Sequence, residues 1–209
     1  MAQGVNDDVH MWRALLAALL AAATLAAFGG CGDEDRERIR STLTAGLTSQ
    51  DPRVVCEGSL TPALLVRIYG GTAKCHATEG DPGEKISQAQ SVEVHSVRVT
   101  GADATAVVVI HGGNHDGARG RLSLHRTGGR WLVRDLSVPL LRSQFEAGIR
   151  RMQSIDPMIK ACVAMKMRKL GDARFKHLAF GADDPAHAQL EAVARRCQAL
   201  IAATRRAAA

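Results

Sequence analysis

The chain is poor in aromatic residues, with two Trp, one Tyr and four Phe among 209 residues. Flat side chains on which bases or sugars stack are therefore scarce. The sequence also lacks a Gly-rich phosphate loop, a Gly-x-Ser-x-Gly nucleophile motif, a Cys-x-x-Cys pair and any internal repeat. These absences disfavour the common nucleotide-binding, serine-hydrolase and zinc-binding classes.

The longest apolar run, residues 11–27, consists mainly of Ala and Leu. Arg13 supplies a basic start and the residues after it an apolar core, which is the pattern of an export signal. The core is shorter than the roughly 20 residues that a membrane-spanning helix needs. We therefore expect residues 1–30 to be a signal peptide. Asp7 and Asp8 place negative charge ahead of the core, which favours Met11 over Met1 as the first residue translated.

The run ends in Leu25-Ala26-Ala27-Phe28-Gly29-Gly30-Cys31. This segment resembles the lipobox of bacterial lipoproteins, in which the cysteine after two small residues receives a diacylglycerol. Gly29 and Gly30 match that pattern, and Phe28 stands where Leu is usual. The resemblance implies lipidation of Cys31 and an extracytoplasmic location, anchored to the bacterial cell membrane by two acyl chains. An ordinary cleaved signal and an uncleaved membrane helix are the alternatives.

Five cysteines are present, and an odd number in an exported chain needs an explanation. A lipid on Cys31 leaves four, which can pair in three ways. Proximity in the sequence favours the disulfides Cys56–Cys75 and Cys162–Cys197, which persist outside the cytoplasm. Metal ligation is the alternative, but the four thiols lack zinc-site spacing.

The chain has a net charge of +6, and much of the positive charge lies near its C-terminus. Anionic lipid headgroups are a possible partner for this basic region. Export argues against nucleic acid, and a solvated basic face with no partner is the alternative. The basic residues concerned are Arg150, Arg151, Lys160, Lys166, Arg168, Lys169, Arg195, Arg196, Arg205 and Arg206.

Helical signals come first in the exported part of the chain. Apolar residues recur every four positions at Ile39, Leu43 and Leu47, which predicts a helix over 33–49. Asp-Pro and Thr-Pro pairs then predict two short helix starts, one running to residue 56 and one to residue 69. We expect residues 72–83 to be a loop that holds Cys75.

Four β-strands are predicted next, over 92–99, 104–110, 121–125 and 130–138. Their short spacing indicates an antiparallel meander, and Gly128-Gly129 is typical of a hairpin turn. The parity of the valines changes between Val94 and Val97, which predicts a bulge in the first strand.

Everything after Pro139 is predicted to be helical, over 140–155, 158–170, 172–179 and 184–205. No segment there is apolar enough to span a membrane. Four methionines at partly helical spacing are expected to pack in the core rather than bind metal: Met152, Met158, Met165 and Met167.

The middle of the chain contains Gln50-Asp51-Pro52-Arg53-Val54-Val55-Cys56-Glu57, Leu60-Thr61-Pro62, the apolar strand at 104–109 and a Gly129-Arg130-Trp131-Leu132-Val133 hairpin. This order resembles the NTF2-like (SnoaL-type, cystatin-like) domains of many bacterial lipoproteins. The resemblance implies an α+β fold in which N-terminal helices pack on a curved antiparallel sheet to form a cone. It assigns residues 31–138 to this domain and leaves 139–209 as an all-α extension.

Two polar groups are candidates for chemistry. His111, His115 and Asp116 could bind a metal, although the glycines around them are equally typical of an exposed turn. His95 and His125 lie on expected strands, and strand alternation places Asp135 on the buried face with Trp131 and Val133. These three side chains are the catalytic candidates if they converge in the cone. The alternatives are that the strand frays before Asp135, or that Asp135 pairs with Arg134 or Arg98 at the surface.

The sequence favours a non-enzymatic, lipid-anchored module that binds a small apolar ligand or a protein partner at the cell envelope, with no cofactor. An NTF2-like enzyme of the isomerase or dehydratase type is one alternative, and a structural envelope protein is the other. What lies on the concave side of the sheet distinguishes them, because an enzyme needs a desolvated His or Asp in an open cavity.

Overall fold

The computed structural model describes residues 32–81, 88–180 and 184–207. The chain divides into two units, Met1–Arg38 and Ile39–Ala209. In the first unit, residues 32–38 are helical and carry ion pairs between side chains one turn apart. The expected signal peptide, residues 1–30, and the expected lipidation site, Cys31, lie outside the described residues. No helix in the described part of the chain is long and apolar enough to cross a membrane.

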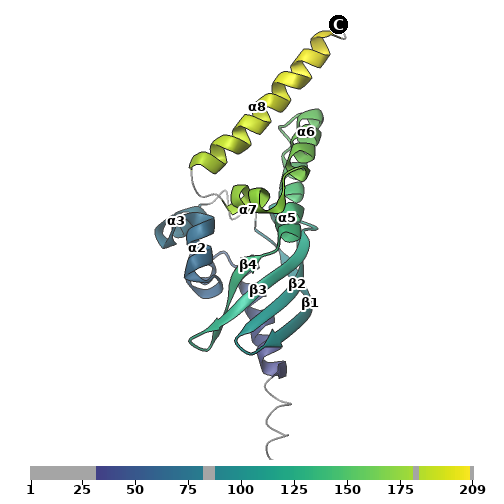
Figure 1. Cartoon of the computed structure of the whole chain (residues 1–209). Helices are drawn as coiled ribbons and strands as arrows, with labels where there is room; N and C mark the ends of the chain where they lie inside the picture. The colour runs from purple at the N-terminus through teal and green to yellow at the C-terminus, as the bar shows by residue number, and fades with distance from the viewer. Residues whose placement is uncertain (1–31, 82–87, 181–183, 208–209) are drawn as a thin grey trace, which may run out of the picture. The chain divides into compact units, whose positions relative to one another are not determined.

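Four antiparallel strands of the second unit form one open sheet in the order β1-β2-β3-β4 (Figure 1). The α+β class and the antiparallel meander predicted from the sequence are confirmed. The strands are β1 (Ser91–Thr100), β2 (Asp103–His111), β3 (Arg119–Thr127) and β4 (Arg130–Leu136), and a short 3-10 helix, η2 (Gly113–His115), lies between β2 and β3.

The turn between β3 and β4 consists of Gly128 and Gly129, with φ values of 57° and 79°. Positive φ at both central residues gives the turn whose twist matches the twist of the two strands, and Gly adopts this conformation without a steric penalty. The hairpin predicted from this glycine pair is present.

Two register shifts interrupt the sheet. The bulge predicted in the first strand lies between Val94 and Ser96. A second shift, which was not predicted, leaves Arg134 of β4 unpaired between Val133 and Asp135. The extra residue changes which side chains of β4 lie on the buried face, because side chains alternate along a strand.

The second unit begins with a helix over residues 39–48, followed by the π-helix η1 (Val54–Ser59), then α2 (Pro62–Tyr69) and α3 (Thr72–Glu79). The loop predicted over 72–83 is wrong for residues 72–79. Cys75 is fully buried in α3 and forms a disulfide with Cys56 of η1, with 6.0 Å between the Cα atoms. This tertiary contact holds in helical form a segment with little helical periodicity of its own.

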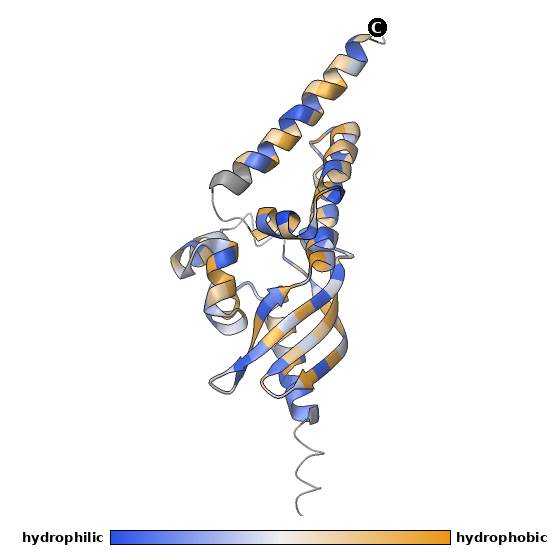
Figure 2. Cartoon of the chain, viewed as in Figure 1, coloured by the Kyte–Doolittle hydropathy of each residue, from blue (hydrophilic) through white to orange (hydrophobic). Residues whose placement is uncertain are grey.

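Four helices follow the sheet: α5 (Val138–Arg151), α6 (Pro157–Arg168), α7 (Asp172–Phe180) and α8 (Asp184–Ala207). Cys162 of α6 and Cys197 of α8 form the second disulfide. Both disulfides join the pairs that proximity in the sequence favoured. Figure 2 shows polar and apolar residues alternating along α8, as expected for a helix with one buried face.

The prediction that four methionines pack in the core holds only for Met167, which is 3% exposed. It is wrong for Met152, Met158 and Met165, whose exposed fractions are 50%, 51% and 46%. Met158 and Met165 are seven residues apart and share a face of α6 that is turned away from the core.

One hydrophobic core joins one face of the sheet to the helices around it. It contains Leu43 from the first helix, Val108 of β2, Trp131 of β4, Leu140 of α5 and Phe175 of α7. The side chains of β2 alternate, so that Ala104, Ala106, Val108 and Ile110 are buried while the residues between them are more exposed. The helices therefore pack against the buried face of the sheet.

Candidate functional site

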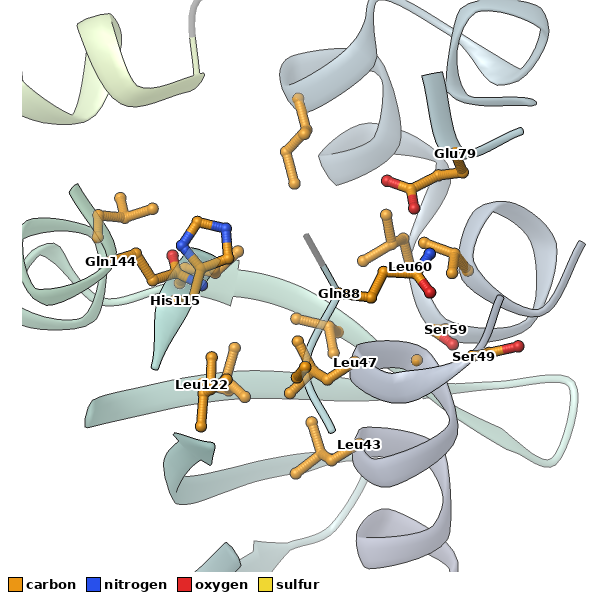
Figure 3. Close-up of a pocket in the computed structure, with 18 of the residues that line it drawn as sticks. Leu43, Leu47, Ser49, Ser59, Leu60, Glu79, Gln88, His115, Leu122 and Gln144 are labelled. Carbon is orange, nitrogen blue, oxygen red and sulfur yellow. The ribbon is translucent and has the colours of Figure 1, made fainter. Parts of the chain in front are cut away.

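A cavity of about 350 Å³ lies in the second unit, against the buried face of the sheet (Figure 3). Most of the side chains around it are apolar, and its size is in the range of small-molecule sites. The apolar side chains around it are Leu43, Leu47, Val55, Leu60, Ile68, Ala89, Ile110, Leu122, Val133, Leu136, Leu141, Ala179 and Phe180. The polar side chains are Thr42, Ser49, Ser59, Tyr69, Glu79, Gln88, His115 and Gln144.

The sheet wall of the cavity comes from strand alternation. Leu122 of β3 and Val133 of β4 lie on the buried face of the sheet. Because one residue of β4 is unpaired, the next side chain of β4 on the buried face is that of Leu136, three residues after Val133. Leu136 pairs with Leu122 and also lines the cavity. A strand without this shift would present Asp135 there instead.

The helical wall includes the stripe predicted from the sequence. Leu43 and Leu47 are one turn apart in the first helix and both line the cavity, while Ile39 belongs to the core and does not line it. The same helix approaches η1 at Gly46, where an added Cβ would lie 2.5 Å from Ser59 Oγ. Only a residue without a side chain allows this close approach.

Several polar groups of the lining have partners within the protein. The Tyr69 hydroxyl donates a hydrogen bond to Glu79 Oε1 at 2.5 Å. The Ser59 hydroxyl donates to the carbonyl oxygen of Val54 at 2.7 Å. These groups are therefore already satisfied without a ligand.

Gln88 differs from them. Its side-chain Nε2 and Oε1 atoms are both buried, and neither has a hydrogen-bond partner among the described residues. Figure 3 places Gln88 between His115 on one side of the cavity and Glu79 on the other. A buried amide without partners is costly, by about 1–3 kcal/mol. This side chain is the unusual polar feature of the cavity.

The three catalytic candidates do not converge at the cavity, since none of them is among its lining residues. His95 is exposed, and its Nε2 lies 3.3 Å from Glu93 Oε2. His125 Nδ1 lies 2.8 Å from Asp103 Oδ1, which also accepts a hydrogen bond from Arg134. The bond with His125, together with the charge of Arg134, lowers the pKa of Asp103 below its ordinary value.

The prediction that Asp135 lies on the buried face with Val133 is wrong. The register shift in β4 places Asp135 opposite Ser123, out of phase with Val133. Its carboxylate pairs with Arg67 of α2 at 3.2 Å and with Lys176 of α7 at 2.5 Å. Asp135 therefore joins two helices by ion pairs, and its partners are not the expected Arg134 or Arg98.

The metal candidates are also engaged by other residues. The Asp116 carboxylate accepts hydrogen bonds from the Gly112 backbone N–H at 2.8 Å and from Arg151 at 3.0 Å. The first of these bonds, with a further contribution from Arg151, lowers the pKa of Asp116. His111 Nε2 lies 3.1 Å from Glu93 Oε1 instead, while His115 lines the cavity. No group of three or more His, Cys, Asp or Glu side chains in the described ranges could hold a metal ion.

Sequence reasoning missed Gln88, Glu79 and Gln144. Glu79 was expected in a loop, and neither glutamine belongs to a motif. Nothing in the local pattern marks these residues, because their role depends on which distant elements surround them.

Comparison with known proteins finds no matching protein family, no matching curated protein and no matching solved structure.

Proposed function

We propose that this chain is a non-enzymatic, lipid-anchored extracytoplasmic module that binds a small and largely apolar molecule in the cavity above its sheet. The observation that carries the proposal is the cavity itself. It has a volume of about 350 Å³ and mainly apolar walls, and it lies against the buried face of the sheet. Apolar burial of a ligand in such a site stabilises the complex by about 25 cal/mol per Å².

The anchor is part of the proposal. The apolar run that ends in Gly29-Gly30-Cys31 supports export and acylation of Cys31. The two disulfides support an oxidising compartment. The domain is proposed to be NTF2-like, with the sheet as the curved wall of a cone and the C-terminal helices as an extension.

The positions of the polar residues favour binding over catalysis. His125 is engaged with Asp103, and Asp135 is engaged with Lys176 and Arg67, away from the cavity. Within the cavity, His115 and Glu79 lie on opposite sides in Figure 3, so they do not form an acid–base pair.

A blocking substitution tests the proposal. Ala179 is exposed and lines the cavity, so Ala179→Trp should fill the space with little cost to the fold. Ala173 is exposed on the same helix and does not line the cavity, which makes Ala173→Trp the matched control. The probe is N-phenyl-1-naphthylamine, excited outside the absorption band of tryptophan and titrated into the purified full chain.

We expect Ala179→Trp to weaken probe binding by about tenfold, the equivalent of about 1.4 kcal/mol. Ala173→Trp should bind as the unsubstituted chain does. Any binding of the probe to the apolar N-terminal run is the same in both variants and does not affect the comparison. Equal binding by the two variants would count against a ligand in this cavity.

A second contact with the membrane is favoured by a specific observation. Exposed methionines of the C-terminal helices, Met158 and Met165, lie on α6 together with the exposed bases Lys166 and Arg168. Such a combination of apolar and cationic side chains suits the boundary of an anionic bilayer. We propose that this surface contacts anionic headgroups once the lipid has anchored the chain.

A further inference from the structure

The side-chain amide of Gln88 presents one acceptor oxygen and one donor nitrogen to its surroundings. Both atoms are buried and both lack a hydrogen-bond partner in the described part of the chain. In native proteins most buried polar groups have hydrogen-bond partners. A buried amide whose oxygen and nitrogen both lack a partner therefore marks a place where a second molecule supplies the hydrogen bonds.

The geometry of an amide determines what satisfies it. A partner with an adjacent donor and acceptor forms two roughly linear hydrogen bonds with the amide edge at once. A single hydroxyl or ether oxygen satisfies one of the two atoms well. Primary amides, lactams and protonated carboxylic acids have the required pair of neighbouring atoms.

The charges around the cavity narrow the choice further. Among the described residues that line it, none is Lys or Arg, and the ionisable side chains are those of Glu79, His115 and Tyr69. An ionised carboxylate or phosphate would meet the carboxylate of Glu79 and would find no Lys or Arg side chain in the lining. An ammonium group donates only, and so leaves the Gln88 nitrogen without an acceptor. The recognised group is therefore neutral. This leaves primary amides and lactams, because a carboxylic acid ionises well below neutral pH.

We infer that Gln88 is the specificity-determining residue of the cavity and that the ligand is a neutral molecule with an apolar body and an amide-like head, either a primary amide or a lactam. This inference rests on the proposed function, because it assumes that the cavity binds an apolar molecule. The apolar walls bind the body of the ligand. Gln88 Nε2 and Oε1 expose almost no surface in the structure, so the side chain turns toward the cavity before the two atoms bind the carbonyl and N–H groups of the ligand.

The test compares two probes with the same eight-carbon chain. Octanamide has an N–H donor beside its carbonyl oxygen, and N,N-dimethyloctanamide has the carbonyl oxygen alone. Calorimetric titration of the purified full chain should show that octanamide binds about tenfold more tightly, because the second probe leaves Gln88 Oε1 unpaired.

Gln88→Met removes both polar atoms at nearly constant shape, and it should make the two probes bind equally. Gln90→Leu is the control, since Gln90 is exposed and does not line the cavity, and it should keep the preference. A thermal melt of Gln88→Met gives an independent readout. Its midpoint should be unchanged or higher, because replacing an unsatisfied buried amide with an apolar group is neutral or stabilising.

Three results would overturn the inference: equal binding of the two probes by the unsubstituted chain, a preference that survives in Gln88→Met, or a clear fall in the melting midpoint of that variant. Equal binding leaves the proposed function standing, because an apolar ligand is then bound without help from Gln88. Failure of both probes to bind overturns the proposed function as well.

Discussion

Gly46 and Ser59 are in direct contact, and a Cβ atom on Gly46 would lie 2.5 Å from Ser59 Oγ and 2.6 Å from Ser59 Cβ. Gly46 belongs to the first helix of the second unit and Ser59 ends the π-helix η1. Both residues line the cavity, so this contact sets the distance between two of its walls.

Gly46→Ala should therefore destabilise the protein, by about 1–3 kcal/mol, because the new methyl group forces two packed backbones apart. Gly148→Ala in α5 is the control, since nothing lies within 4 Å of its added Cβ. Gly148→Ala lowers the conformational entropy of the unfolded chain, so it should stabilise the protein by about 0.4–1 kcal/mol. Chemical denaturation measures both, and equal effects of the two substitutions would contradict the close contact.

The two disulfides should differ in their effect on ligand binding. Cys56–Cys75 links η1 to α3, which carry the cavity residues Val55 and Glu79. Replacing this pair by Ala should cost about 2–4 kcal/mol of stability and weaken binding of N-phenyl-1-naphthylamine.

Replacing Cys162 and Cys197 by Ala should have a similar cost in stability. Binding of the same probe should be kept, because neither residue lines the cavity and none of the described side chains of α8 does. Loss of binding in this second variant would show that the cavity depends on the α6–α8 pairing.

Acid should weaken the start of α6 through Asp156. This carboxylate accepts a hydrogen bond from the Met158 backbone N–H at 2.8 Å and pairs with Arg205, and these contacts lower its pKa below the ordinary value of 3.8. A lowered pKa in the folded state means that the unfolded state binds the proton more readily. The stabilisation is therefore present above pH 3.8 and is lost as the pH falls through the lower pKa of the folded state.

Asp156→Asn keeps a capping side chain but removes this titration. Its melting midpoint should fall less steeply than that of the unsubstituted chain when the pH is lowered from 7 into the acid range. Thermal melts over a pH series measure the difference, and parallel curves would argue against the role of Asp156.

Cys31→Ser should release the chain from membranes, because it removes the acceptor of the proposed diacylglycerol and the two acyl chains that it supplies. Fractionation of cells that express the variant measures the soluble share. Mass spectrometry of the unsubstituted chain should find the lipid on Cys31. Retention of Cys31→Ser in the membrane fraction would contradict the proposed anchor.

The basic face of α6 should give a weaker, salt-sensitive contact. In the Cys31→Ser background, binding to phosphatidylglycerol vesicles should fall at high salt and on charge reversal of Lys166 on α6 and Lys169 at its C-terminal cap, both of which are exposed. Reversal of Lys74 and Arg53, which are exposed in the helices before the sheet, is the control. Equal losses from both pairs would mean that net charge alone attracts the vesicle.

Local signals in the sequence determined much of the fold. Gly128-Gly129 specified a hairpin because few other residue pairs adopt that backbone conformation, and the valine parity of β1 located its bulge. Proximity in the sequence was enough to favour both disulfide pairs. These features depend on neighbours along the chain, so a linear pattern contains them.

The site was decided by the tertiary structure. The extra residue in β4 turned Asp135 away from the cavity and brought Leu136 to it, and no composition signal marks that position. Gln88 became notable only because the sheet and the helices around it bury its amide without supplying a partner. Burial and hydrogen bonding of such groups arise from contacts between distant segments, and a one-dimensional pattern does not contain those contacts.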